Sequence, residues 1–502
     1  MPRTHNVPFM ATRLMAGAAP LSRQLYDEIR AAIVQGRLGA GARLPSSRSL
    51  SVQLGVARNT VLLAFDQLVA EGYLEGRVGS GMRVADLRPE DALEARPQPV
   101  ARAPRRAART SRLSRRGRML ATTLVTVARA SGPLGAFRMG QPAIDEFPFP
   151  TWRRLAARFW TRPPRDLLTY GDPGGYVRLR EAIAAHLRAA RAVVCEPEQV
   201  IVVSGSQQAL DLAARLLLDP GDAVWLEDPG YVGARGAFQA AGARVVPVPV
   251  DADGIDVARG IRMARGARVA YVSPSHQYPT GAVLARARRL ALLEWARRRG
   301  AWILEDDYDS EFRYAGWPLE SLQGIDGGER VLYVGTFSKV LLPSLRLGYL
   351  VVPRALVGAF RNARGLVDRQ PPGPEQAALA AFLEEGHFVR HVRRMRVLYA
   401  ERQAALVRAA ERELASWVTV APSPAGMHLV GRLRDGLDDR TASAAAEARG
   451  VEVAPLSRYA IRPRPAARGL LFGYAAFDPR VIRTGVRALA ETLADLDSRA
   501  RR

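Results

Sequence analysis

The segment that decides the fold reads Gly335-Thr336-Phe337-Ser338-Lys339-Val340-Leu341-Leu342-Pro343-Ser344-Leu345-Arg346, and it follows an apolar run, Val331 to Val334. This run is typical of a buried strand, because it is rich in β-branched and aromatic residues and a glycine ends it. Hydroxyl and guanidinium groups bind phosphate, and an amine that has lost its proton attacks a carbonyl carbon. The segment therefore predicts a strand end that combines an anion site with a nucleophilic lysine.

Lys339 is the only lysine in the chain. The sequence has 73 Lys and Arg residues together, and all but Lys339 are arginine. Arginine does not deprotonate in proteins, so it cannot replace lysine where a neutral primary amine is needed. The count favours a chemical role for Lys339, although survival by chance remains an alternative until its neighbours are considered.

Two further motifs also lie at the ends of predicted strands. Leu304-Glu305-Asp306-Asp307-Tyr308 offers a carboxylate, which can pair with a protonated ring nitrogen, and a phenol, which can hydrogen-bond a ring oxygen. Ser204-Gly205-Ser206-Gln207-Gln208 lies between a strand and a helix, where backbone N–H groups cradle phosphate. Each motif alone is weak evidence, but the three converge on one chemistry.

Together these motifs resemble the fold-type I aminotransferases over residues 131–502, and the resemblance implies pyridoxal 5′-phosphate as the cofactor. It assigns Lys339 to the catalytic position, as the lysine that forms the internal aldimine. It places Asp306 against the pyridine nitrogen and Tyr308 against the ring oxygen. The same resemblance gives the phosphate site to Ser206, Gln207, Thr336, Ser338 and Arg346.

The resemblance also assigns two aromatic residues further upstream. Tyr231, in Glu-Asp-Pro-Gly-Tyr, matches the aromatic side chain that stacks on the cofactor ring. Tyr170 matches a tyrosine that reaches the phosphate from the neighbouring subunit, which implies a head-to-tail homodimer. For Asp307 we expect a solvated or capping carboxylate rather than catalysis, and His276 matches no assignable base.

Residues 131–502 alternate short β-branched runs with helical stretches, which predicts an α/β fold with a mainly parallel sheet. From about Gly365 the pattern predicts a long helix with Arg-rich faces and then a small C-terminal α+β subdomain. Seven strands are expected, near residues 200–203, 223–226, 244–248, 269–272, 301–304, 331–334 and 347–352.

Residues 20–86 predict a separate winged helix-turn-helix domain. Apolar residues at helical spacing indicate a first helix, Leu44-Pro45-Ser46-Ser47-Arg48 offers hydroxyl caps for a second, and Gly55 makes a tight turn before a third. Gly72-Tyr73-Leu74 then begins a hairpin whose tip is rich in glycine. Two helices around a glycine turn, followed by a hairpin, are typical of a DNA-binding winged helix.

This domain resembles the GntR family through Leu-Pro-Ser-Ser-Arg, Leu-Gly-Val-Ala-Arg-Asn-Thr-Val, Gly-Tyr-Leu and a Gly-Ser-Gly wing. The first residues of a recognition helix face base edges in the major groove. Two positions depart from the family: Ala57 stands where many relatives have Ser or Thr, and Leu62 replaces an Arg that is common in some branches. The positions expected to contact double-stranded promoter DNA are Arg48, Arg58, Asn59, Thr60 and Gly79.

Residues 87–130 are rich in Arg, Pro and Ala and predict a linker. Nine arginines and no acidic residue occur between Ala95 and Arg118. The segment either slides along DNA phosphates or serves as a solvated spacer, and the sequence favours neither.

The formal charge of +24 indicates a polyanionic partner, although a GC-rich genome would also favour arginine codons. No apolar run is long enough to span a membrane, and no secretory signal is recognisable. We expect a cytoplasmic bacterial protein, nucleoid-associated when bound to DNA, with no membrane partner. The single cysteine, Cys195, excludes an intramolecular disulfide and a Cys-based metal site, and we predict no metal site.

A GntR-type head joined to an aminotransferase-like body resembles the MocR family of bacterial regulators. Tyr278 stands where aminotransferases usually have Asn, and Leu470 stands where they have the arginine that clamps the substrate carboxylate. Arg458, Arg462 or Arg468 could replace that arginine; otherwise the ligand is not an ordinary α-amino acid. We therefore expect a regulator that senses pyridoxal 5′-phosphate, or an aldimine of it with an amino compound, and has at most residual transaminase activity; the alternative is a working aminotransferase.

Overall fold

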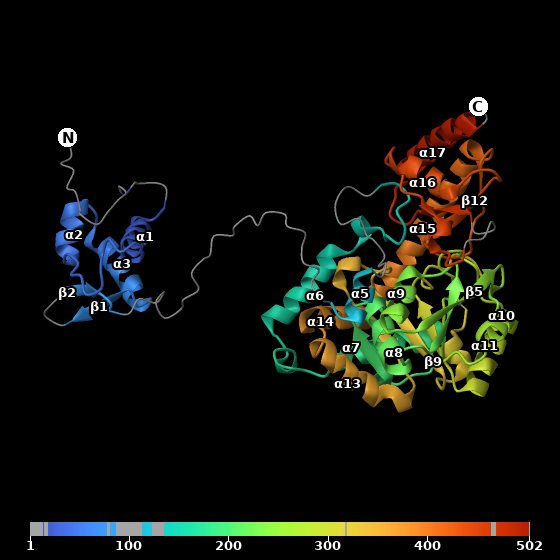
Figure 1. The fold of residues 1–502 in the computed structure, drawn as a ribbon, viewed down its shortest axis with the longest axis horizontal. Coiled ribbons are helices and arrows are strands. Elements are labelled where there is room, and N and C mark those ends of the chain that lie inside the picture. The colour runs from blue at the N-terminus through green and yellow to red at the C-terminus, as the bar shows by residue number, and fades with distance from the viewer. Residues whose placement is uncertain are drawn as a thin grey trace. The chain divides into compact units, whose positions relative to one another are not determined.

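The computed structural model describes residues 14, 19–77, 81–86, 113–122, 135–316, 319–462 and 468–500. These residues divide into two compact units, one up to residue 86 and one from residue 113 (Figure 1). Each unit has its own buried core.

The N-terminal unit contains three helices and one hairpin. Helices α1 (Leu21–Val34), α2 (Ser47–Leu54) and α3 (Arg58–Ala70) precede the antiparallel strands β1 (Leu74–Arg77) and β2 (Gly81–Val84). The Ser46 side chain caps α2 by accepting a hydrogen bond from the Ser49 amide, and Gly55 ends that helix with φ +66°. The predicted winged helix is confirmed, and its core includes Leu25, Ile29, Val61, Phe65 and Leu68.

The second unit is built on an eight-stranded sheet with the order β3-β10-β9-β8-β7-β4-β5-β6. The five central strands, β9, β8, β7, β4 and β5, are joined by four parallel pairings, whereas β10 is antiparallel to both β3 and β9. The strands are β3 (Val200–Val203), β4 (Ala223–Asp228), β5 (Arg244–Asp251), β6 (Gly254–Ile255), β7 (Val269–Val272), β8 (Trp302–Asp307), β9 (Val331–Thr336) and β10 (Gly348–Val351).

All seven predicted strands are present, and the sheet is mainly parallel as expected. The additional strand, β6, has two residues and pairs with the end of β5, so it is too short for its pattern to be read from the sequence. Helices cover both faces, and successive strand residues enter different cores: Val202 packs in one apolar cluster and Val203 in another. The covering helices are α7 (Val177–Arg191), α8 (Ser206–Leu217), α9 (Val232–Ala240), α10 (Val257–Ala264), α11 (Arg286–Arg299) and α12 (Leu322–Asp326).

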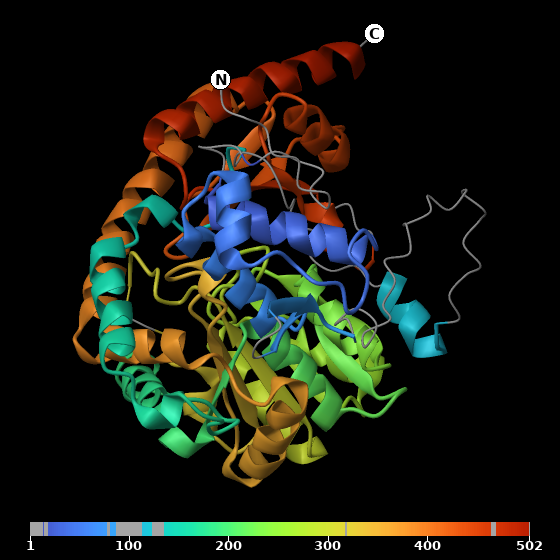
Figure 2. The ribbon, with the colours of Figure 1, turned by 90° about the vertical axis from the view of Figure 1, so that its left-hand side faces the viewer.

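The long helix predicted from about Gly365 is three helices, so that prediction was wrong in detail. Gly365 lies inside α13 (Val357–Asp368), and α14 (Gly373–Glu384) is separated from α15 (His387–Glu413) by Gly386, which has φ +72°. A left-handed glycine ends one helix before the next begins. Figure 2 shows α15 and α17 (Pro479–Ala500), which pack against each other along one edge of this unit.

The expected C-terminal α+β subdomain contains a second sheet with the order β11-β12-β14-β13. Helix α16 (Asp439–Glu447) packs beside it. The strands are β11 (Val418–Val420), β12 (His428–Leu433), β13 (Ala454–Pro455) and β14 (Gly469–Gly473).

Two helices precede the large sheet in the chain. Helix α6 (Phe149–Thr161) packs on α14, and α5 (Arg115–Thr122) lies against α9. Helix α5 falls in the segment expected to be a linker, most of which lies outside the described residues. None of the helices in the described ranges combines the length and hydropathy that a membrane-spanning segment requires.

Candidate functional site

A cavity of about 840 Å³ opens where the loops after β4, β7, β8 and β9 meet. The carboxyl ends of parallel strands share one edge of a sheet, so residues that follow different strands converge there. Nine of the ten residues assigned to the cofactor line this cavity: Ser206, Gln207, Tyr231, Asp306, Tyr308, Thr336, Ser338, Lys339 and Arg346.

Lys339 points into this cavity. Its Nζ donates a hydrogen bond to the carbonyl oxygen of Gly140 at 2.8 Å. Burial lowers the pKa of Lys339, which favours the neutral amine that acts as a nucleophile. Gly140 has φ +72°, and a Cβ added there would lie 2.6 Å from Nζ. A side chain at this position would therefore displace the end of Lys339, and the positive φ of Gly140 disfavours any residue other than glycine.

Asp306 presents one satisfied and one unsatisfied oxygen to the cavity. Its Oδ2 accepts a hydrogen bond from the Tyr271 hydroxyl at 2.7 Å. Its Oδ1 is buried and has no hydrogen-bond partner among the described residues, and the same holds for Ser338 Oγ. Burial raises the pKa of Asp306 to about 6. Both orphaned oxygens require a polar partner, because a buried polar group without one costs about 1–3 kcal/mol.

The anion-binding side of the cavity is built by α8 and Arg346. Helix α8 begins at Ser206 after Gly205, which has φ +85°, and its first N–H groups have no intrahelical partner. Arg346 Nη2 donates to the Ser204 carbonyl at 2.7 Å. A Cβ on Gly205 would lie 3.1 Å from the same nitrogen, so glycine allows the guanidinium to close over the turn.

Tyr308 belongs to a buried polar cluster. Its hydroxyl lies 3.0 Å from His276 Nδ1, and the same nitrogen lies 2.9 Å from Asp309 Oδ2. Burial raises the pKa of Tyr308 well above its usual range and lowers that of His428 to about 3. Ligand atoms of His276, Asp309 and His428 lie within 4.8 Å of one another. The sequence did not indicate this group, because we predicted no metal site.

Tyr170 is the one assigned residue that does not line the cavity. Its side chain is 80% exposed, and the Arg369 guanidinium lies 4.6 Å from the centre of its ring. Among the described residues of one chain, Tyr170 forms no hydrogen bond, ion pair or ring contact with another residue assigned to the cofactor.

Several residues of the cavity were not predicted from the sequence. Tyr271, which holds Asp306, lies inside strand β7, where a tyrosine reads as an ordinary core residue. Arg138 and Glu452 form a bidentate ion pair on the cavity wall, with N–O distances of 2.5 and 2.6 Å. These two residues are 314 positions apart, so no local pattern indicates the pair.

The two departures from the aminotransferase pattern have different surroundings. Tyr278 lines the cavity, and its hydroxyl donates to the Tyr459 hydroxyl at 3.2 Å. Leu470 is fully buried in β14 and is not among the cavity residues. Of the three arginines proposed as replacements for a carboxylate clamp, Arg458 lines the cavity, and Arg462 and Arg468 do not.

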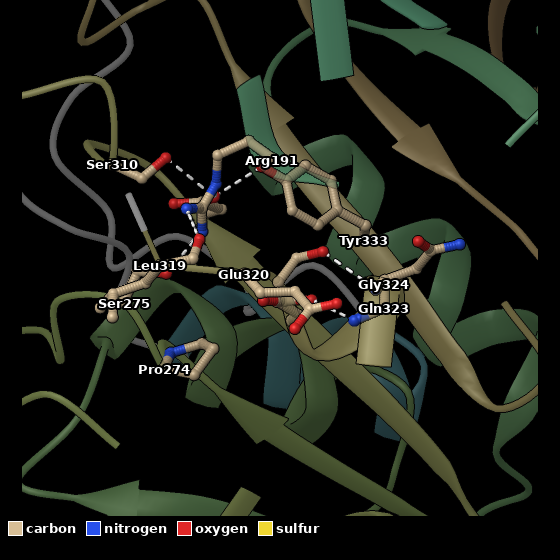
Figure 3. A network of polar contacts seen from close by, with 12 residues as sticks. Arg191, Pro274, Ser275, Ser310, Leu319, Glu320, Gln323, Gly324 and Tyr333 are labelled. Atoms are coloured by element: carbon tan, nitrogen blue, oxygen red, sulfur yellow. Dashed lines mark hydrogen bonds and ion pairs between the residues drawn. The ribbon is translucent and has the colours of Figure 1, made fainter. Parts of the chain in front are cut away.

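Asp307 is neither solvated nor a helix cap, contrary to the expectation from sequence. Its Oδ2 accepts hydrogen bonds from Arg191 Nε at 2.8 Å, Tyr333 OH at 2.5 Å and Ser310 Oγ at 2.9 Å. Arg191 also donates to Ser275 Oγ at 2.7 Å, and Figure 3 shows this guanidinium surrounded by its partners. Adjacent residues of a strand point to opposite faces of the sheet. Asp306 therefore points into the cavity, and Asp307 points to the other face, where it pairs with Arg191.

The N-terminal unit presents three of its assigned residues on the surface. Arg48, Arg58 and Asn59 are exposed, and Thr60 is half-buried. Arg58 begins α3, and its Nε donates to Ser47 Oγ at 3.3 Å, which joins the first turns of α2 and α3. Gly79 lies outside the described residues.

Comparisons with known proteins agree with this two-part architecture. Two family models match the chain: aminotransferase class I and II over residues 137–488, and bacterial regulatory proteins of the gntR family over residues 21–84. The chain is also 45% identical to the probable rhizopine catabolism regulatory protein MocR of Rhizobium meliloti over 479 residues, which cover 95% of each chain. The chain belongs to the MocR family.

Other comparisons support the same assignment of this MocR-family chain. It is 33% identical to the pyridoxine biosynthesis transcriptional regulator PdxR of Corynebacterium glutamicum, over 94% of this chain and 95% of that one. The structure of LysN, an α-aminoadipate aminotransferase of Thermus thermophilus, matches with a TM-score of 0.67 and 31% identity, over 73% of this chain and 93% of that one. MocR-family proteins are transcription regulators, and the class I and II aminotransferase fold normally binds pyridoxal 5′-phosphate.

Proposed function

We propose that this MocR-family regulator binds promoter DNA through its winged helix and responds to pyridoxal 5′-phosphate, alone or with an amino compound, in the cavity of its aminotransferase-like body. The observation that carries the proposal is the position of the only lysine in the chain. Lys339 faces a cavity in which Asp306 Oδ1 and Ser338 Oγ are buried without partners. These groups fit an aldehyde, a protonated pyridine nitrogen and a phosphate, respectively.

In this proposal the cofactor, when bound, supplies an aldehyde that condenses with primary amines. Lys339 provides the amine, and its lowered pKa keeps a larger fraction of that amine neutral. Tyr271 orients Asp306 through its hydrogen bond, and Tyr231 covers the ring. Ser206, Gln207, Thr336, Ser338 and Arg346 hold the phosphate.

We propose that the protein acts as a head-to-tail homodimer in which Tyr170 completes the partner's phosphate site. The exposure of Tyr170 supports this proposal, because an aromatic ring in water is unfavourable. Leu168 and Leu366 are 57% and 89% exposed in the same unit. A homodimer also suits a regulator, since it supplies two DNA-binding heads.

On DNA, we propose that Arg58, Asn59 and Thr60 read base edges and that Arg48 binds a phosphate or a base. Arg48 and Arg58 are exposed and lie at the beginnings of α2 and α3. The beginning of the second helix of a helix-turn-helix enters the major groove. We also propose that the protein acts in the cytoplasm, where this DNA is found.

The proposal is tested by footprinting the protein on the DNA upstream of its own gene, with and without pyridoxal 5′-phosphate. We expect a protected region whose extent or affinity changes with the cofactor. A different outcome would support a working aminotransferase: multiple-turnover amino transfer at rates typical of enzymes, with a DNA affinity that does not change when the cofactor is added.

A further inference from the structure

One buried histidine beside the cavity takes no part in the function proposed above. His276 is 2% exposed, and neither it nor Asp309 lines the cavity. Tyr308 does line it, and His276 Nδ1 lies 3.0 Å from the Tyr308 hydroxyl and 2.9 Å from Asp309 Oδ2. One ring nitrogen therefore connects a buried carboxylate to a phenol on the cavity wall.

The surroundings of the His276 ring decide which of its nitrogens carries a proton. Nε2 is buried and has no hydrogen-bond partner among the described residues. The backbone closes around this nitrogen: a Cβ added at Gly426 would lie 2.5 Å from Nε2, and one added at Gly281 would lie 3.1 Å from it. A proton on Nε2 would be a buried donor without an acceptor, which is unfavourable.

Asp309 favours the same tautomer through the other ring nitrogen. An ionised carboxylate accepts hydrogen bonds and donates none, so the 2.9 Å contact requires a proton on His276 Nδ1. Burial raises the pKa of the Asp309 carboxyl group, and the hydrogen bond from His276 opposes that rise. Both nitrogens therefore indicate a proton on Nδ1.

This tautomer fixes the direction of the contact with Tyr308. Because Nδ1 already carries a proton, it cannot accept one from the Tyr308 hydroxyl, and the phenol oxygen is the acceptor of this contact. The hydroxyl proton of Tyr308 is thus left for another acceptor. Since Tyr308 lines the cavity, that acceptor can belong to a molecule bound there.

The neighbouring polar rings are engaged elsewhere. His428 Nε2 lies 3.0 Å from a backbone carbonyl, which only accepts, so this nitrogen donates; burial lowers the pKa of His428 to about 3. The Tyr278 ring lies edge-on to that of Tyr308 with centres 5.8 Å apart, and its hydroxyl donates to Tyr459. His276 is therefore the side chain that orients the Tyr308 hydroxyl.

We propose that His276 is a positioning residue that donates from Nδ1 to the Tyr308 oxygen, with Asp309 holding its tautomer, and so reserves the Tyr308 proton for the ring oxygen of the cofactor. This inference rests on the proposed function, since Tyr308 must face that oxygen. A hydrogen bond to an anionic oxygen favours the ionised form. The Tyr308 hydroxyl should therefore lower the pH midpoint of the change in cofactor absorption, and His276 should strengthen that effect.

The substitution His276→Phe tests the direction of donation, because it keeps a planar ring and removes both nitrogens. The pH midpoint of cofactor absorption is measured in the cofactor-loaded full-length protein, with Asp306 and Lys339 unchanged. We expect the midpoint to rise by about half a pH unit or more, and Tyr308→Phe to raise it further. If Tyr308 instead donated to His276, the substitution would free the hydroxyl proton and the midpoint would fall.

A double-mutant cycle and a matched control separate positioning from packing. In the Tyr308→Phe background, His276→Phe should leave the midpoint unchanged, because its effect passes through the hydroxyl. His186→Phe makes the same change at a histidine that packs against Phe388 and does not line the cavity, so the midpoint should stay at the wild-type value. A fall or no change in the single variant, or an equal rise in both backgrounds, would overturn the inference.

A second measurement needs no cofactor. Nitrogen NMR of the cofactor-free full-length protein, labelled with 15N-histidine, shows which ring nitrogen is protonated, and the His276→Phe spectrum identifies the signals. We expect the proton on Nδ1. Normal cofactor uptake with the proton on Nε2 would overturn the inference alone. A wild-type protein that takes up no cofactor would overturn the proposed function, and the role of His276 with it, even if Nδ1 is protonated.

Discussion

Replacing Asp307 by asparagine tests whether the buried ion pair with Arg191 stabilises the body of the protein. The substitution keeps the shape of the side chain but removes its charge. Arg191 then remains buried with its positive charge uncompensated, because its side chain is 7% exposed and Asp307 is its ion-pair partner. Breaking a buried pair by removing one partner costs about 3–5 kcal/mol.

This cost translates into a measurable change in melting temperature. Unfolding entropy is about 2.1 cal/mol/K per residue, so a unit of about 390 residues has an entropy of about 0.8 kcal/mol/K at Tm. A loss of about 3–5 kcal/mol should therefore lower Tm by about 4–6 °C. Differential scanning calorimetry of the cofactor-free protein measures this shift.

The matched control is Glu294→Gln, which breaks an ion pair with Arg298 on the surface of α11. Its two side chains are 51% and 77% exposed, and such a pair contributes about 0–1 kcal/mol. The expected decrease in Tm is about 1 °C or less. If Asp307→Asn lowers Tm no more than this control, the reasoning about the buried pair is refuted.

Three further predictions concern Arg58 in the winged helix, Gly140 beside the Lys339 amine, and Asp306, which is assigned to the ring nitrogen of the cofactor. Arg58→Ala should abolish binding to the upstream DNA in a gel-shift assay and leave cofactor absorption intact; unchanged DNA binding contradicts its assignment. Gly140→Ala should weaken cofactor uptake measured by absorbance, because φ +72° disfavours a side chain there and the new Cβ would displace the Lys339 amine, whereas Gly358→Ala, with no described atom within 4 Å of its Cβ, should bind normally. Burial raises the pKa of Asp306 from 3.8 to about 6. Between these two pH values the folded protein binds more protons than the unfolded chain. Asp306 therefore makes the free energy of unfolding fall as the pH rises from about 4 to about 6. Asp306→Asn should flatten this dependence in cofactor-free protein, and denaturant titrations at pH 4 and pH 7 that show equal pH dependence in both proteins would contradict the burial argument.

Much of the site could be predicted because its residues follow predicted strands. Asp306 lies next to the last residue of β8, Lys339 follows β9 and Ser206 follows β3. A mainly parallel sheet brings these positions to one edge, so the strand pattern and the motifs together predict the cavity. The winged helix was equally readable, because Gly55 and the capping Ser46 mark its helix boundaries locally.

The remainder depends on contacts between distant parts of the chain. Asp307 was misjudged because its partner, Arg191, lies 116 residues away and has no local signature. Arg138 and Glu452 are still further apart. The division of the predicted long helix at Gly386 was missed because buried apolar residues at helical spacing occur on both sides of that glycine, although the arginines are confined to α15. Propensity alone does not reveal which polar residues become buried in pairs.

The central claim is that the aminotransferase-like body binds its cofactor and that this binding changes the affinity of the winged helix for DNA. The most direct test measures the Kd for the upstream DNA with wild-type protein and with Lys339→Ala, each with and without pyridoxal 5′-phosphate. Coupling between two sites typically amounts to a change of about fivefold or more. We predict such a change for the wild-type protein and none for Lys339→Ala. A wild-type affinity that is the same with and without the cofactor, or a Lys339→Ala variant that responds like the wild type, would contradict the account.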